Sequence, residues 1–203
     1  MTVEHWLQLL AVLAGIAVIL IPLLGFRCAE RRVRGRESGV AASLLRWPVM
    51  LVQTVLFVVV GVLSWHPLPL VLSPTLFGIV LALGSLLYFP GTALYLWGYR
   101  SLGHMFGISS GFGAALYQNH RLIRSGPYQD MRHPMCLAVI LTAFGALFIF
   151  RTWTMVLYAP MSLGVVFRAR REEHLLAKEF GKEWQAYRRE VNEWIPRLRK
   201  RVK

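Results

Sequence analysis

The sequence predicts an all-α, polytopic integral membrane protein with about five transmembrane helices and a C-terminal cytoplasmic helix. Of its 203 residues, 56% are hydrophobic and only 16% are charged, which is too little charge for a soluble domain of this size. Several apolar runs approach the length of about 20 residues that a membrane-spanning helix needs. The basic residues behind the net charge of +13 flank these runs, as topology signals and lipid contacts do, so nucleic-acid binding is disfavoured.

The first three predicted spans occupy the N-terminal half of the chain. Trp6–Phe26 has the required length, and we interpret it as a retained anchor, because Glu4 precedes it and the basic start of a signal peptide is missing. Leu44–Trp65 is the second span. Leu70–Tyr99 is longer and contains prolines, beginning with Pro74, so this third span is expected to be tilted, kinked or late to start.

The last two predicted spans are short and form a helical hairpin. Met135–Phe150 and Trp153–Phe167 are almost wholly apolar, and they are separated only by Arg151 and Thr152. We therefore expect the chain to turn at these two residues and to return to the face of the membrane from which it came.

The distribution of arginine predicts the orientation. The loop between the first two spans carries a cluster of arginines: Arg27, Arg31, Arg32, Arg34, Arg36 and Arg46. The next loop, Ser64–Pro69, has neither Lys nor Arg. Because positively charged loops stay in the cytoplasm, the N-terminus is expected outside, and residues 100–134 and 168–203 inside. We expect the membrane to be a prokaryotic inner membrane.

Two polar clusters lie at the two ends of the predicted hairpin. The first is the run Gly126–Pro134, and the second begins at Arg168 and continues through two adjacent glutamates. Since both ends of a hairpin return to one membrane face, the clusters are expected to form a single site at the bilayer surface. The glycine-rich stretch before the first cluster, Tyr99–Met131, is interpreted as a flexible connector.

Residues 168–190 are predicted to form a helix. Arg168 and Glu172 are one turn apart and so lie on one face. An apolar stripe at helical spacing is formed by Leu175, Leu176, Phe180, Trp184 and Tyr187. On these residues alone, the favoured interpretation is an ordinary ion pair on a surface helix, and a functional site is the alternative.

Taken together, the motifs resemble a known family. The chain reads Gly126-Pro127-Tyr128-x3-Arg132-His133-Pro134, and later Glu172-Glu173-x2-Leu176-x3-Phe180-Gly181-x5-Tyr187 and Ile195-Pro196. This order and spacing resemble the isoprenylcysteine carboxyl methyltransferase family and, more widely, integral membrane phospholipid methyltransferases. The resemblance covers about residues 95–198, roughly half the chain.

The resemblance implies an S-adenosylmethionine-dependent methyltransferase, with the cofactor in a cytoplasmic pocket formed by the last helices and their loops. Residues 100–203 would be the catalytic half, completed by the cytoplasmic helix, and residues 1–99 the N-terminal transmembrane part. The positions that match the family's cofactor contacts are His120, Arg121, Leu122, Ile123, Tyr128, Arg132, His133, Pro134, Met135 and Glu172. Arg168 matches the substrate-side arginine, so Arg168 and Glu172 are the expected catalytic residues.

The chain departs from the family pattern at three positions. Cys136 stands where a tyrosine is common, Ala138 where a glycine is frequent, and Trp184 where a tyrosine is usual. These changes keep the polar contacts but alter the wall of the expected pocket. The N-terminal half carries no motif, so the resemblance does not identify the acceptor.

The residues suit methyl transfer, which is an in-line displacement that needs mainly alignment and desolvation. No metal-binding motif is present, and no metal is expected. Arg121 or Arg132 could meet the carboxylate of the cofactor, and Arg168 suits an anionic acceptor because a guanidinium holds both oxygens of a carboxylate. A carboxylate needs no general base near pH 7, whereas an amine or thiol does. The expected acceptor is therefore lipophilic and acidic, such as a prenylcysteine-like acid.

Two other functions remain open from the sequence. Some membrane sterol reductases have similar C-terminal motifs and use NADPH, whose 2′-phosphate would suit the arginines, but Glu172 and Glu173 would repel phosphate. A non-catalytic membrane scaffold would bind neither cofactor. Stabilisation by S-adenosylhomocysteine or by NADPH would separate the three possibilities.

Overall fold

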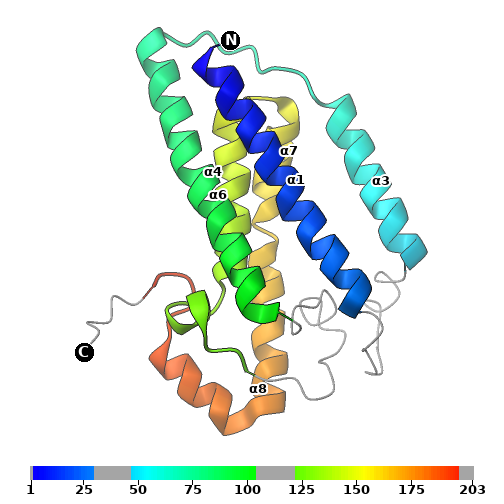
Figure 1. Cartoon of the computed structure of the whole chain (residues 1–203), viewed down its shortest axis with the longest axis vertical. Helices are drawn as coiled ribbons and strands as arrows, with labels where there is room; N and C mark the ends of the chain where they lie inside the picture. Colours follow the sequence, from blue (N-terminus) through cyan, green and yellow to red (C-terminus); the bar gives the residue numbers. More distant parts are fainter. Residues whose placement is uncertain (1, 30–46, 104–121, 197–203) are drawn as a thin grey trace.

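The computed structural model describes residues 2–29, 47–103 and 122–196, and every regular element within these ranges is helical. The all-α prediction is therefore confirmed for this part of the chain. The elements are α1 (Val3–Ala29), α3 (Trp47–Leu63), α4 (Pro74–Leu102), the 3₁₀ helix η3 (Gly126–Gln129), α6 (Pro134–Phe150), α7 (Trp153–Ser162) and α8 (Val165–Glu190). Figure 1 shows α1, α4, α6 and α7 as a bundle, with α3 to one side and α8 extending beyond its end.

Two of the expected spans have the full length of a transmembrane helix. Val3–Ile21 and Pro74–Leu102 are long and apolar enough to cross a bilayer, and Val52–Leu63 and Pro134–Phe150 are shorter apolar helices. The third predicted span, Leu70–Tyr99, was expected to be tilted, kinked or late to start, and its helix does start late. Its helix begins at Pro74, where the side chain of Ser73 accepts a hydrogen bond from a first-turn amide.

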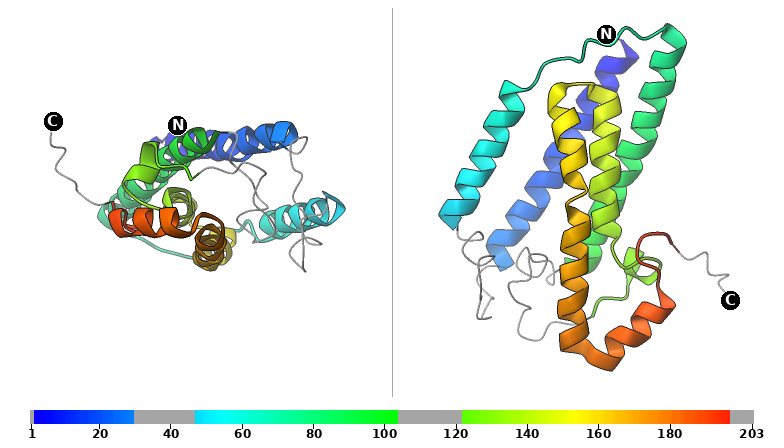
Figure 2. Two further views of the ribbon diagram at one scale, coloured as in Figure 1. Left: turned by 90° about the horizontal axis from the view of Figure 1, so that it is seen from below. Right: turned by 180° about the vertical axis from the view of Figure 1, so that it is seen from behind.

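The fifth predicted span is not one continuous helix. α7 ends at Ser162 and α8 begins at Val165, so the expected segment Trp153–Phe167 is divided. Pro160 lies inside α7 and has no amide N–H to donate. After it the backbone forms a hydrogen bond of the tighter 3₁₀ type, from the amide of Leu163 to the Pro160 carbonyl at 3.0 Å. Seen from behind, α8 continues the direction of α7 past the end of the bundle (Figure 2).

The predicted hairpin turn at Arg151 and Thr152 is confirmed. Arg151 ends α6 in a left-handed conformation, with φ 48° and ψ 48°. Its guanidinium donates to the carbonyls of Phe148 and Ile149, at 3.0 and 3.1 Å, and forms an ion pair with Glu4 of α1. Arg151 therefore lies at the tip of the hairpin, where it satisfies carbonyls that the helix end would leave without a partner.

A stripe of glycines in α4 sets the packing at the centre of the bundle. Gly84, Gly91 and Gly98 recur every seventh residue, and a Cβ on any of them would lie 2.7 to 2.9 Å from a side-chain atom of α6. The partners run in reverse order along α6, from Phe148 down to Met135, so the two helices are antiparallel. Small residues on one face allow this close approach. Among lipid tails the hydrophobic effect does not drive helices together, so van der Waals packing is what stabilises the contact.

Hydrogen bonds from tyrosine and threonine side chains attach α1 and α3 to the neighbouring helices. Tyr88 of α4 donates to the Ala11 carbonyl of α1 at 2.6 Å. Thr154 of α7 donates to the Gly61 carbonyl of α3 at 2.8 Å, and Tyr158 bonds to the backbone of α3 one turn earlier. The outward faces of α1 and α3 are apolar and exposed, as lipid-facing surfaces are.

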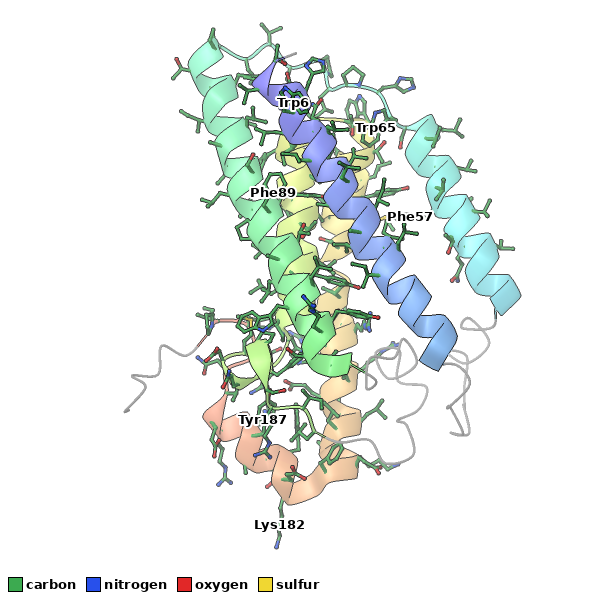
Figure 3. The ribbon with its side chains drawn as sticks, in the orientation of Figure 1. Trp6, Phe57, Trp65, Phe89, Lys182 and Tyr187 are labelled. Carbon is green, nitrogen blue, oxygen red and sulfur yellow. The ribbon has the colours of Figure 1, made fainter. Side chains whose placement is uncertain are left out.

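Three exposed tryptophans lie at the end of the bundle away from α8, while a fourth, Trp97, is 50% exposed near the other end, in the last turns of α4. Trp6, Trp65 and Trp153 are 52%, 46% and 49% exposed, and each stands at or near a helix end. Figure 3 places Trp6 and Trp65 at the end opposite Tyr187 and Lys182. Tryptophan favours the membrane–water interface, so this end has the character of a membrane surface.

Candidate active site

A pocket lies at the end of the bundle from which α8 emerges. It is a partly open cavity of about 430 Å³, a volume that includes space continuous with solvent. The end of α4, the stretch before α6, and α8 supply its lining: Leu102, Leu122, Ile123, Tyr128, Arg132, His133, Glu172, Leu176, Trp184 and Tyr187. The structure thus brings the two polar clusters of the sequence to one place.

Close approach to α4 shapes the near wall. Gly126 has φ 63°, and a side chain there would collide with Ser101. Pro127 is buried, and Tyr128 follows within η3. At Gly98, a Cβ would lie 2.7 Å from Met135 Cγ. The glycines therefore let the Gly-Pro-Tyr segment pack directly on the last turns of α4, where Tyr128 enters the pocket wall.

A bend in α8 closes the far wall. Gly181 interrupts the helix with φ 47° and ψ −112°, a conformation that favours glycine. After this bend the helix turns back beneath the bundle (Figures 1 and 2). Trp184 and Tyr187 are thereby buried in the wall, and the Tyr187 hydroxyl donates to the Tyr128 carbonyl at 2.6 Å.

Arg132 joins the parts of this wall. Its Nε and Nη2 both lie 2.8 Å from Glu173 Oε1, and its Nη1 donates to the carbonyls of Arg188 and Val191 at 3.2 and 2.9 Å. The same Glu173 oxygen is 3.1 Å from His133 Nε2. Arg132 therefore has little capacity left to bind the carboxylate of a cofactor, as the sequence predicted it could, because most of its N–H groups already donate to protein acceptors.

The charges in this cluster shift the pKa values of its members. Burial would lower the pKa of His133, but hydrogen bonds to Cys136 and Glu173 and the charge of Glu172 raise it to about 9. Burial opposes ionisation of Glu173 as well, yet the bond to His133 and the charge of Arg132 hold its pKa below the usual value. At neutral pH Arg132 and His133 are thus two cations beside the Glu173 carboxylate, and the carboxyl group of Glu193 also lies within 4.8 Å.

Glu172 faces the cavity while its neighbour Glu173 faces the cluster. Burial raises the pKa of the Tyr128 phenol well above its usual value, the charge of Glu172 raises it further, and the charge of Arg168 lowers it. Both charged residues of α8 are therefore close to Tyr128. Glu172 lines the pocket, and Arg168 lies one turn nearer the bundle without lining it.

The expected site residues fall into three groups. Those that line the pocket are Leu122, Ile123, Tyr128, Arg132, His133 and Glu172. Three do not line it: Pro134 is buried at the start of α6, Met135 packs on Gly98, and Arg168 lies one turn nearer the bundle than Glu172. His120 and Arg121 lie outside the described residues.

Four lining residues were not among the expected site residues. Leu176, Trp184 and Tyr187 belong to the apolar stripe of the predicted helix. Leu176 and Tyr187 stand in the family motif and Trp184 was expected in the pocket wall, but none of the three was assigned a contact to cofactor or substrate. The stripe was the available signal, since it continues past Glu172 on the same helix. Leu102 ends α4 and has no motif around it, so the sequence offered no signal for it.

His133, Glu173 and Glu193 bring potential metal-ligating atoms within 4.8 Å of one another. A metal ion here would have to displace the proton of His133, whose pKa its neighbours raise to about 9. The Arg132 guanidinium also lies 2.8 Å from the Glu173 carboxylate. The group is therefore better described as an ion-pair cluster than as a metal site.

An all-helical membrane protein with a mixed polar and apolar pocket at one end of its bundle is the class that these observations define. The family model for phospholipid methyltransferase matches residues 79–183, which is more than half of the chain. The chain belongs to this family, and the resemblance inferred from its motifs is confirmed. Among curated proteins, none matches the chain. Membership makes the protein a membrane methyltransferase for lipid-like substrates, which disfavours the reductase and the scaffold.

Proposed function

We propose that the protein transfers a methyl group from S-adenosylmethionine to the carboxylate of a lipophilic acid at the cytoplasmic surface of a membrane. The observation that carries the proposal is the pocket itself, because residues from both motif clusters line it together. Family membership supplies the methyltransferase class, and the details of cofactor, acceptor and orientation are inferred from the residues.

The lining suits the cofactor. Aliphatic and aromatic side chains such as Leu176 and Trp184 offer a surface for an adenine ring. Glu172 is the acid that borders the cavity, and a carboxylate suits the sulfonium, the amino group or the ribose hydroxyls. When bound, the cofactor supplies a methyl group already activated on sulfur. The role left to the protein is to orient the two reactants and to exclude water.

The proton chemistry favours a carboxylate acceptor. Tyr128 keeps its phenolic proton at pH 7, because burial raises its pKa well above the usual value. His133 is held as a cation by its neighbours, with a pKa of about 9. Neither of these lining residues is a ready base near pH 7. Arg168, close to Tyr128 and one turn from Glu172, is placed to hold an acceptor carboxylate, which needs no deprotonation.

A second candidate acceptor is the amine of a phospholipid headgroup. The description of the matching family favours it, since that family is named for phospholipid methylation. An amine must lose a proton before it attacks, so this reaction would depend strongly on pH between neutral and alkaline values. A carboxylate acceptor would not show that dependence.

The helices support lateral access for such a substrate. The pocket lies where α4 ends, where α6 begins and where α8 leaves the bundle, next to the exposed apolar surface of the helices. We propose that a lipophilic acceptor reaches Arg168 from the bilayer, while the water-soluble cofactor reaches Glu172 from the cytoplasm.

Calorimetric titration with S-adenosylhomocysteine in detergent tests the cofactor. The wild-type protein should bind it, and Glu172→Gln should weaken binding by about ten- to a hundredfold, the usual effect of losing a charged hydrogen bond. Glu179→Gln is the matched control, because Glu179 is exposed on the same helix. Equal affinities in the three proteins would remove Glu172 from the site, and no binding to wild type would contradict the proposed cofactor.

Transfer of labelled methyl from S-adenosylmethionine tests the acceptor. The wild-type protein should label a prenylated thiol acid and not phosphatidylethanolamine. The reverse result would establish the amine candidate.

A further inference from the structure

The chain after α8 runs beside the motif residues that precede α6. The amide of Arg132 donates to the Asn192 carbonyl at 2.9 Å, and the amide of His133 donates to the Glu193 carbonyl at 3.1 Å. The two stretches are parallel here, with a bridge between Met131 and Asn192. Residues 191–194, which we call the strap, therefore hold the backbone of Arg132 and His133 from outside the pocket.

Side chains reinforce this attachment. Nη1 of Arg132 donates to the Val191 carbonyl at the start of the strap, and to the Arg188 carbonyl in the last turn of α8. The terminal carbonyls of a helix have no partner within the helix, so these bonds both fix Arg132 and satisfy the end of α8. Val191 is itself buried against the apolar cluster that includes Trp184 and Tyr187.

Trp194, at the end of the strap, covers His133. The indole and imidazole centroids are 5.6 Å apart, and the two rings are tilted by 37°. Glu173 holds the other side of the imidazole through Nε2 at 3.1 Å, and only 4% of His133 is exposed. One ring of the pocket wall is therefore fixed between a carboxylate from α8 and an indole from the strap.

We propose that Trp194 is a positioning residue for cofactor binding, which it supports by fixing the orientation of His133 in the pocket wall. The proposal rests on the proposed function, because it takes S-adenosylmethionine as the ligand of the pocket. Trp194 is not among the residues that line the cavity, so its effect passes through the imidazole. The strap thus connects the end of α8 to the residues before α6.

Two substitutions at one position test the role of the indole. Trp194→Ala should weaken S-adenosylhomocysteine binding by about three- to tenfold, which corresponds to the usual strength of a contact between two aromatic rings. Trp194→Phe keeps a ring over His133 and should bind within about twofold of wild type. Ile195→Ala is the control, because Ile195 follows directly and is 74% exposed. In turnover, Trp194→Ala should raise the KM for S-adenosylmethionine and leave kcat nearly unchanged.

Hydrogen exchange gives a readout that needs no cofactor. In Trp194→Ala the amides of Arg132 and His133 should exchange faster than in wild type, while amides in the middle of α6 keep their rates. Unchanged exchange at these two amides, or equal binding losses in the Ala and Phe variants, overturns the proposal. If wild type does not bind S-adenosylhomocysteine, the proposed function fails, and the exchange rates alone then decide whether the strap holds these residues.

Discussion

At the residue scale, Arg168 and Glu172 are one turn apart on α8 but have different surroundings. Glu172 lines the pocket, whereas Arg168 lies nearer the bundle. We expect Arg168→Ala to abolish methyl transfer and to leave the affinity for S-adenosylhomocysteine within about threefold, less than a charged hydrogen bond is worth. Arg168→Lys should also be poor, because a single ammonium cannot replace a two-pronged guanidinium. The measurements are transfer of labelled methyl and calorimetry on the same preparations.

The control for this prediction is Arg171→Ala, because Arg171 is exposed on the same helix and should affect neither quantity. Simultaneous loss of cofactor affinity and activity in Arg168→Ala would assign Arg168 to the cofactor site or to folding.

His133 makes the stability of the protein depend on pH. Its pKa is raised from 6.5 to about 9, so the folded state holds the proton more tightly than the unfolded chain does. The resulting stabilisation is complete below pH 6.5 and is lost as pH rises through about 9. We expect the thermal unfolding midpoint of the wild-type protein, measured in detergent without ligand, to fall over this interval.

The variant His133→Gln isolates this contribution, since glutamine has no titrating group in this range. The thermal unfolding midpoint of this variant should change less between pH 6.5 and 9 than that of wild type. Parallel curves for the two proteins would show that another group controls the pH dependence.

The sequence predicted which residues line the pocket better than it predicted their hydrogen-bond partners. Tyr128, His133 and Glu172 were recognised because short motifs and spacing carry that information. The bonds from Arg132 to Arg188 and Val191 were not predicted, because the acceptors are backbone carbonyls, which any residue has. A motif can therefore name a residue without showing whether that residue contacts the ligand or holds the site together.

At the element scale, the glycine stripe of α4 determines how closely α6 can pack. Gly91→Leu places a side chain where a Cβ alone would lie 2.8 Å from Thr142 Oγ1 and 3.0 Å from the Thr142 amide nitrogen. We expect this variant to lose about 1–3 kcal/mol of stability through overpacking. Gly78→Leu on the same helix is the control, because nothing lies within 4 Å of a Cβ there. Thermal unfolding in detergent measures both, and equal midpoints would contradict the packing argument.

The bend at Gly181 also shapes the pocket, and it depends on the backbone conformation of this residue and not on its packing. A Cβ at Gly181 would meet nothing within 4 Å, but φ is 47° and ψ is −112°. Gly181→Ala should therefore cost at least about 1 kcal/mol of stability, or straighten α8. Straightening would withdraw Trp184 and Tyr187 from the pocket and weaken S-adenosylhomocysteine binding. Calorimetry should show this loss for Gly181→Ala and none for the exposed neighbour in Lys182→Ala.

The elements also show where a sequence pattern is reliable. Long apolar runs predicted α1 and α4, and Arg151 marked the hairpin turn. The break between α7 and α8 was not predicted, because Pro160 sits within an apolar run that reads as one span. The glycine stripe was overlooked as well, since a repeat of seven matters only when a partner helix lies against it.

At the scale of the whole molecule, the two ends of the bundle differ in a way that predicts its orientation. α1 ends and α3 begins at the end where the pocket lies (Figure 1). The sequence between them is rich in arginine, and residues 30–46 of it lie outside the described part of the chain. The opposite end carries the loop without Lys or Arg and the exposed Trp6 and Trp65. By the positive-inside rule, the pocket end should face the cytoplasm.

A topology assay tests this arrangement together with the five-span proposal. A reporter fused after Lys203 should be active in the cytoplasm, and a reporter inserted at His66 should be active outside. An odd number of spans is needed to separate an external N-terminus from an internal C-terminus, and α7 with the first turn of α8 would supply the fifth despite its break at Gly164. A C-terminus found outside would place Glu172 and the pocket on the external face. A cytoplasmic donor could not then reach the pocket, and both the orientation and the proposed cofactor route would be wrong.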